Sequence, residues 1–166
     1  TAAFGAQTTE SAVFTDESLD AYALNAAYTA DSYGVSVTYG VVETSTTNED
    51  TYTAFNAYYL PEGSNLPSLS VGYEIGDIGG AAATADEKTS FMVGLSWDEV
   101  GPGSAGIAVG HSSTVEGNDE EYQYEAYYSY PVNDGMTITP LIFTKDVATE
   151  GADDTTGVMV KTSFSF

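Results

Sequence analysis

Apolar and polar residues alternate with a period of two along most of the chain. In the segment 22–28, Tyr22, Leu24 and Tyr28 fall on one face, and Asn25 falls on the other. Nothing recurs at the helical period of 3.6, and the alternating segments are rich in β-branched and aromatic residues. The pattern therefore predicts β-strands, with nine segments centred in 22–28, 35–41, 55–59, 68–75, 90–97, 104–109, 121–130, 136–144 and 158–166, and a tenth within 2–6.

The connections between these strands are of two kinds. One set consists of compact turns bearing glycine or proline, at 31–34, 61–67, 100–103 and 133–135. The other set is generally longer and very acidic, at 44–50, 77–87, 112–120 and 146–154. Short turns at one end and longer polar loops at the other are the layout of outer-membrane barrels. The acidic segment 7–20 is an external segment or a loop folded into the lumen.

Three features favour a membrane barrel over a soluble β-sandwich. The polar faces carry mostly small residues and little charge, and the chain stops on an apolar strand. Aromatic residues near the strand ends suit two interfacial girdles. We therefore predict an all-β fold over residues 1–166, an antiparallel transmembrane β-barrel with nine to ten strands. The girdle residues are Tyr22, Tyr28, Tyr59, Trp97, Tyr122, Tyr130 and Phe166.

The composition restricts the partners. The chain has three Lys and no Arg against 25 Asp plus Glu, a formal net charge of −22. Such a chain repels nucleic acids and anionic headgroups, so its small partners are expected to be cations. There is no cysteine and a single histidine, His111, which argues against disulfides, a zinc site and a catalytic triad. We predict no enzyme activity, no metal site and no cofactor, and a structural place for His111 near the outer rim.

The strand register predicts which polar side chains face the lumen. They are Asn25, Asn56, Glu74, Asp98, Glu121, Gln123, Glu125 and Lys161. Glu74 and Glu125 lie closest to mid-strand, where a carboxylate biases an aqueous channel towards cations. The alternative is that these carboxylates are merely solvated or pair with Lys161. Tyr58 and Tyr127 also face inward, where they form an aromatic path for sugars or fill space beneath a loop.

Two rival functions come from other classes. The first is a secreted acidic β-sandwich adhesin or surface-layer module that binds Ca²⁺ through Asp153 and Asp154 or through the segment 118–121. These segments lack the spacing of an EF-hand, which favours solvated loops. The second is a catalytic outer-membrane barrel, for which the sequence offers no convincing constellation.

The C-terminal half resembles a known family. The segments 125–130, 136–140 and 161–166, together with Ser96-Trp97-Asp98 and the following Gly101-Pro102-Gly103, resemble cyanobacterial outer-membrane porins. This family is related to the carbohydrate-selective porins and often called iron-uptake porins. The aromatic-x-aromatic end, Phe164-Ser165-Phe166, is its most specific part, although Lys161 stands where a glycine is common.

The resemblance implies a barrel of about sixteen strands, of which this chain supplies the C-terminal part, behind a periplasmic domain that grips peptidoglycan. A complete ten-stranded barrel is the alternative. It also implies an outer-membrane porin for small hydrophilic solutes and inorganic ions, including iron and carbohydrates, assembled as a homotrimer. The assembly machinery of the outer membrane would read Phe166. The expected channel is water-filled and prefers cations.

Overall fold

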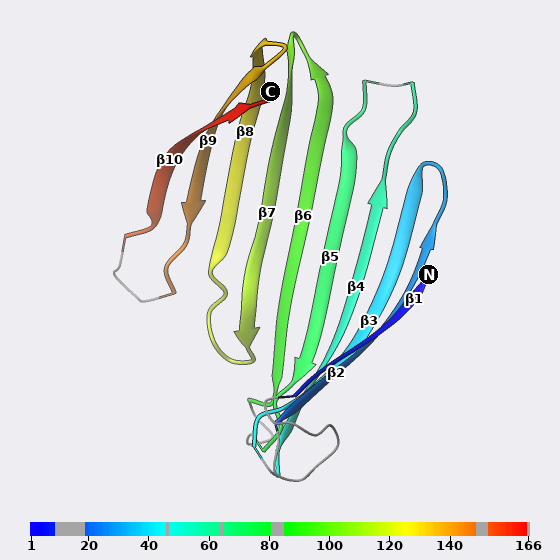
Figure 1. Cartoon of the computed structure of the whole chain (residues 1–166). Coiled ribbons are helices and arrows are strands. Elements are labelled where there is room, and N and C mark those ends of the chain that lie inside the picture. The colour runs from blue at the N-terminus through cyan, green and yellow to red at the C-terminus, as the bar shows by residue number, and fades with distance from the viewer. Residues whose placement is uncertain (9–18, 46, 64, 81–84, 149–152, 166) are drawn as a thin grey trace.

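One antiparallel β-sheet of ten strands accounts for the described part of the chain. The computed structural model describes residues 1–8, 19–45, 47–63, 65–80, 85–148 and 153–165. Each strand pairs with the next in sequence, so the sheet is a continuous meander (Figure 1). The strands are β1 (Ala2–Thr8), β2 (Asp20–Thr29), β3 (Tyr33–Glu43), β4 (Glu49–Tyr59), β5 (Ser68–Asp77), β6 (Glu87–Val100), β7 (Gly103–Val115), β8 (Tyr122–Asn133), β9 (Met136–Lys145) and β10 (Thr155–Phe164).

The sheet is strongly curled but open (Figure 1). The strand order begins at β1 and ends at β10, and no ladder between these two strands is present among the described residues. The prediction of an all-β, antiparallel chain with nine to ten strands is therefore confirmed. The described strands do not by themselves close into a barrel.

The compact turns are built by glycine and proline as the sequence predicted. The hairpin between β6 and β7 has a two-residue loop, Gly101-Pro102, because Val100 pairs with Gly103. Gly101 has a φ of 62°, which a type II′ turn requires at its first central position. In the hairpin between β8 and β9, the Gly135 amide donates to Asn133 Oδ1 at 2.9 Å. Such an Asx-type contact fixes a tight turn.

Several predicted loop boundaries were wrong, because the backbone ladder continues past the apolar alternation. β4 begins at Glu49, inside the predicted loop 44–50, and β7 extends to Val115, inside the predicted loop 112–120. Lys88 pairs with Val115, so polar residues are held in strand conformation by their neighbours. At the other end, β3 begins at Tyr33 rather than after residue 34.

The described residues have no hydrophobic core within the chain. No hydrophobic side chain among the described residues is buried, whereas the side chain of Asp20 is fully buried. Large apolar side chains are instead exposed, among them Leu24 at 57%, Phe55 at 51% and Val158 at 75%. Leu95, Val71 and Tyr124 lie on one face of this single sheet, and they do not meet across a second layer.

Candidate functional site

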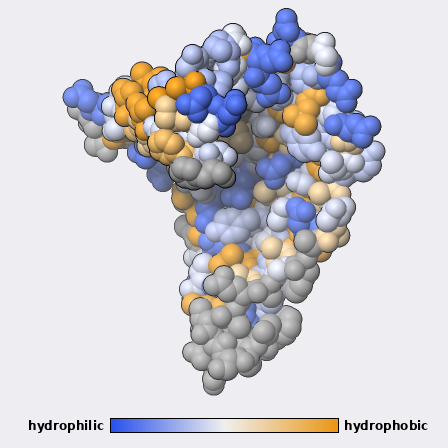
Figure 2. All heavy atoms as spheres, turned by 45° about the horizontal axis from the view of Figure 1, so that its top comes forward, coloured by the Kyte–Doolittle hydropathy of each residue, from blue (hydrophilic) through white to orange (hydrophobic). Residues whose placement is uncertain are grey.

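The inner face of the curled sheet carries small and polar side chains. Residues paired in register share a face, so one row can be followed across neighbouring strands. That row contains Ala27, Ser36, Asn56, Gly72, Met92, Gly110 and Gln123. Figure 2 shows a hollow whose visible lining is mostly hydrophilic or neutral, while hydrophobic residues gather at the upper left, where β9 and β10 lie. We call this side of the sheet the polar face.

Aromatic rings on the polar face lie against glycines of the neighbouring strand. Tyr58 covers Gly34 and Tyr127 covers Gly106, since a Cβ atom on either glycine would meet ring atoms of that tyrosine. Tyr52 covers Gly76 and Phe143 covers Gly157 in the same way. Each ring and glycine are register partners. Covering a strand glycine with a cross-strand aromatic ring is a known stabilising device. Tyr58 and Tyr127 were predicted either to form a path for sugars or to fill space beneath a loop. Neither alternative included the contact of these rings with glycine.

Six of the predicted lumen residues share the polar face by register. They are Asn25, Asn56, Glu74, Gln123, Glu125 and Lys161. Asn25 Nδ2 donates to Thr38 Oγ1 at 2.7 Å on the neighbouring strand, so this amide is oriented. Gln123 pairs in register with Gly110 on β7.

The two mid-strand carboxylates have different surroundings. Glu74 lies between Ala54 and Ser90, which are small residues. Glu125 lies between Ala108 and Phe143, so an aromatic ring flanks it on one side. The two carboxylates are three strands apart, and neither belongs to the ion pairs found within the described residues.

Asp98 and Glu121 lie at opposite ends of the sheet rather than along its middle. Asp98 is exposed near the compact-turn end of β6, beside a register irregularity between Trp97 and Val100. It lines a depression of about 400 Å³ with Pro61 and Leu66. Glu121 immediately precedes β8, at the loop end.

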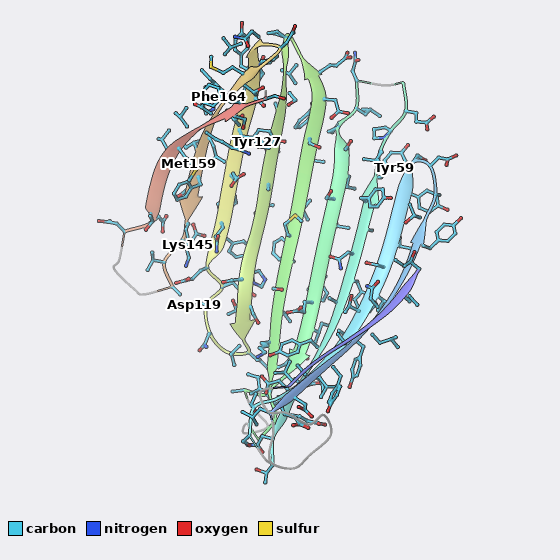
Figure 3. All side chains as sticks on the ribbon, in the orientation of Figure 1. Tyr59, Asp119, Tyr127, Lys145, Met159 and Phe164 are labelled. Atoms are coloured by element: carbon cyan, nitrogen blue, oxygen red, sulfur yellow. The ribbon has the colours of Figure 1, made fainter. Side chains whose placement is uncertain are left out.

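Glu121 is held by a lysine that the sequence reading did not consider. Its Oε2 lies 2.8 Å from Lys145 Nζ, and the Ala148 amide donates to its Oε1 at 3.3 Å. The lysine that pairs with this predicted lumen carboxylate is therefore Lys145, at the end of β9, and not Lys161. The hydrogen bond from Lys145, the Ala148 amide and the positive charge of Lys145 lower the pKa of Glu121 below its ordinary 4.5. Figure 3 places Lys145 towards the loop end of the sheet and Tyr127 towards the turn end.

A second ion pair anchors the loop between β5 and β6. Asp50 Oδ2 lies 3.0 Å from Lys88 Nζ, and the side chains are 9% and 18% exposed. The Gly79 amide donates to Asp50 Oδ1 at 3.0 Å, and the Tyr52 hydroxyl donates to Oδ2 at 3.1 Å. Lys88 Nζ also lies 4.7 Å from the centre of the Tyr52 ring. The sequence offered no signal for this cluster, because its members come from separate strands and a loop.

Carboxylates concentrate at the loop end of the sheet. Apart from the two pairs above, most of the described acidic residues lie where strands meet the longer connections. We call this set the acidic rim: Asp20, Glu43, Glu49, Asp77, Asp86, Glu87, Glu116, Asp119, Glu120, Asp146, Asp153 and Asp154. Few carboxylates lie near the compact turns, namely Asp31, Glu62, Asp98, Glu99 and Asp134. The two ends of the sheet therefore differ sharply in negative charge.

No metal site is evident in the described ranges. They contain no group of three or more His, Asp or Glu side chains placed to hold an ion. His111 is 8% exposed and lies on the apolar face, 4.9 Å from the Phe91 ring and 5.7 Å from the Tyr122 ring. Its Nδ1 lies 2.9 Å from the Ser112 carbonyl oxygen. This histidine is packed among aromatic rings.

The opposite face of the sheet is apolar and rich in aromatic residues at the turn end. Tyr28 and Tyr33 have ring centres 6.0 Å apart, and Tyr33 pairs in register with Tyr59. The predicted residues Trp97 and Tyr130 share this face with Tyr128, whose hydroxyl donates to the Val100 carbonyl at 2.8 Å. Phe164 continues the set on β10 (Figure 3). The turn-end aromatic set is therefore Tyr28, Tyr33, Tyr59, Trp97, Tyr128, Tyr130 and Phe164.

The remaining predicted aromatic residues lie elsewhere. Tyr22 lies near the start of β2 and Tyr122 begins β8, both at the loop end, and the Tyr22 hydroxyl donates to Asp20 Oδ2 at 2.7 Å. Phe166 lies outside the described residues, as does most of the segment 7–20, although Gln7 and Thr8 belong to β1.

Comparison of the chain with protein-family models, with curated proteins and with solved structures found no match in any of the three. Among the described residues, no helix is long and apolar enough to cross a membrane.

Proposed function

We propose that this chain forms part of the wall of a water-filled channel in an outer membrane. The protein would be a porin for the passive diffusion of small hydrophilic solutes and inorganic cations. The observation that carries the proposal is the uncovered apolar face. Tyr39, Phe55 and Ile107 on that face are 50%, 51% and 49% exposed, and no second layer of described residues packs against them. Hydrocarbon is the solvent that suits such a face.

The total surface supports this argument by its magnitude. A folded soluble monomer of 17.4 kDa is expected to expose about 7,900 Å². This chain exposes 10981 Å². Soluble monomers rarely expose contiguous apolar patches beyond a few hundred Å². The apolar face contributes to this large exposed area, and in the proposed barrel lipid would cover that face.

Strand length supports a membrane location as well. A strand needs about 9–11 residues to cross a bilayer at the usual tilt. β2, β5, β9 and β10 have 10 residues each, and β3 and β4 have 11. The turn-end aromatic set suits the headgroup level on one side of the membrane.

Barrel closure follows from the same proposal. Within hydrocarbon every backbone N–H and C=O group needs a partner, so the free edges of β1 and β10 must pair with strands in the membrane. The likeness to cyanobacterial porins extends the proposal to a larger barrel, to iron and carbohydrates as solutes, and to a homotrimer.

The charges give the channel its preference. Glu74 and Glu125 lie on the polar face, and the acidic rim at one mouth raises the local concentration of cations within a Debye length of about 8 Å. The rim carboxylates outnumber the paired Lys88 and Lys145 there, so the mouth retains negative potential.

The test is a reversal-potential measurement in planar bilayers with a gradient of KCl. We expect discrete channel openings, and a reversal potential whose sign shows that K⁺ passes more readily than Cl⁻. The double variant Glu74→Gln, Glu125→Gln should move the potential towards zero. Chloride preference would refute the charge argument. A chain that stays soluble without detergent and binds Ca²⁺ would refute the porin and favour the secreted adhesin.

A further inference from the structure

Among the described residues, the polar face contains a depression with a mainly apolar lining. It has a volume of about 660 Å³ and lies over β6 to β10. Its apolar lining on this face comes from Met92, Leu141, Phe143 and Met159. Met92 and Met159 are 46% and 56% exposed, whereas the rest of the face carries mainly glycine, serine, alanine and asparagine. Large exposed apolar groups on a wetted wall are costly, unless a ligand covers them.

Glu125 stands inside this depression. It is exposed, lines the depression and is the register partner of Phe143. Gln123 and Lys145 also line the depression, but Lys145 is bound to Glu121, and within the described residues no ion pair neutralises Glu125. A ligand that covers the apolar lining would exclude water from this carboxylate, and the carboxylate would then gain more from a cationic partner than a fully solvated carboxylate does.

The ring of Phe143 is placed to contribute as well. Its ring lies over Gly157 of β10 and so is laid along the wall, while its backbone position on β9 is the register partner of Glu125 on β8. The face of an aromatic ring attracts cations, and the attraction is strongest where water is excluded. Glu125 and Phe143 are direct cross-strand neighbours, and both the carboxylate and the aromatic ring attract cations.

From this juxtaposition we infer that the depression around Glu125 is a binding subsite for small organic cations, with a positive nitrogen at Glu125 and Phe143 and an apolar substituent on Met92, Leu141 and Met159. The inference rests on the proposed function, since it names a class of solute that the channel would hold on its way through. Inorganic cations would satisfy Glu125 but would leave the apolar lining uncovered.

Glu74 provides a matched comparison within the chain. It is a mid-strand carboxylate on the same face, but its register neighbours are Ala54 and Ser90, and it does not line the depression. Charge alone would make the two carboxylates equivalent. The proposed subsite predicts that Glu125, and not Glu74, contributes to the binding of an organic cation.

The experiment measures binding by the whole chain folded in detergent micelles, so that it does not depend on channel formation. The probe is benzyltrimethylammonium, and its binding is followed by isothermal titration calorimetry. Tetramethylammonium and benzyl alcohol serve as probes that each lack one half of the ligand. Folding of every variant is checked by circular dichroism.

We expect benzyltrimethylammonium to bind more tightly than either partial probe. Glu125→Gln should weaken binding by about tenfold or more, because it removes a charged partner. Glu74→Gln should change binding by less than about twofold. Met159→Ser, at an exposed position on β10 where folding is little affected, should weaken benzyltrimethylammonium binding but leave tetramethylammonium binding unchanged.

Equal effects of Glu125→Gln and Glu74→Gln, equal binding of benzyltrimethylammonium and tetramethylammonium, or no binding by the folded protein would overturn the subsite. These outcomes are separate from the bilayer test. Channels without binding would refute the subsite alone, and binding without channels would refute the porin alone.

Discussion

At the scale of single residues, the pair of Glu121 and Lys145 joins three pieces of the loop end. Glu121 precedes β8, Lys145 ends β9, and the Ala148 amide belongs to the following loop. The side chains of the ion pair are 33% and 42% exposed, so solvent and salt screen much of the attraction. The pair is therefore expected to position the loop more than to stabilise the fold.

Its pH dependence follows from the direction of the pKa shift. The pKa of Glu121 is lower in the folded state than its ordinary 4.5, so the folded state favours the charged carboxylate. The stabilising contribution is complete above the ordinary pKa and is lost as the pH falls through the lowered folded value. Glu121→Gln should therefore lose less stability than the parent chain on acidification below about pH 5. Thermal unfolding in micelles at a series of pH values would measure this difference.

Glu116→Gln provides the control, since this residue lies in the same loop and belongs to neither of the two ion pairs described above. It should follow the parent chain across the series. Parallel curves for Glu121→Gln and the parent chain would contradict the prediction.

Register explains which residue-level features the sequence could and could not predict. The alternation correctly assigned Tyr22, Leu24 and Tyr28 to one face, because period two depends on neighbours in sequence. The partner of Glu121 was missed, because Lys145 comes close only through the pairing of β8 with β9. The rings over Gly34 and Gly106 depend on cross-strand pairing for the same reason.

At the scale of elements, hairpins were predicted well where glycine or proline defines the turn. Gly101-Pro102 and Asp134-Gly135 are two-residue loops in the positions expected. Strand ends at the acidic rim were predicted poorly, because Glu49 and Thr114 are paired in ladders although their side chains give no strand signal. In β9, Leu141 and Phe143 face the polar side, which the alternation around Pro140 did not reveal.

The cluster of Asp50 and Lys88 connects three elements, namely β4, β6 and the loop that contains Gly79. Lys88→Met should destabilise the fold by about 3 kcal/mol, because it leaves a buried carboxylate without its cation. The Gly79 amide and the Tyr52 hydroxyl remain as partners of Asp50, which keeps the loss near the lower end of the usual range. The free energy of unfolding in micelles, measured with urea, would give the value.

Two further variants make this prediction specific. Lys161→Met, which changes an exposed lysine on β10, should alter the unfolding free energy by less than about 0.5 kcal/mol. The double variant Asp50→Asn, Lys88→Met should recover part of the loss, since no charge remains unpaired. A double variant as unstable as the sum of its single variants would show that the ion pair is not coupled.

At the scale of the whole molecule, the two faces of the sheet predict opposite tolerance to charge. Val37 on the apolar face and Ser36 on the polar face are adjacent in the middle of β3. In lipid, Val37→Lys should cost about 2–4 kcal/mol, because its ammonium group would lie in hydrocarbon. Ser36→Lys should be tolerated, because its ammonium group would lie in water. Folding into lipid vesicles, followed by the heat-modifiable mobility of the folded form on gels, would compare them.

Equal folding yields of Val37→Lys and Ser36→Lys would contradict the assignment of the apolar face to lipid. A soluble single-sheet protein would give that result, since water would meet both faces. The sequence predicted the two faces, but closure and the pairing of the edges lie beyond it, because they depend on strands brought together over long distances in the fold.

The glycines beneath Tyr58, Tyr127, Tyr52 and Phe143 set the clearance of the hollow. A ring resting on a glycine adds roughly the thickness of its π-system to the wall, about 3.5 Å, rather than the full length of the side chain. Even an alanine at one of these positions would push the ring outward. In the proposed channel, a wall surfaced in this manner could be rich in tyrosine and still leave room for solutes, so its glycine content would govern their passage as much as its charges would.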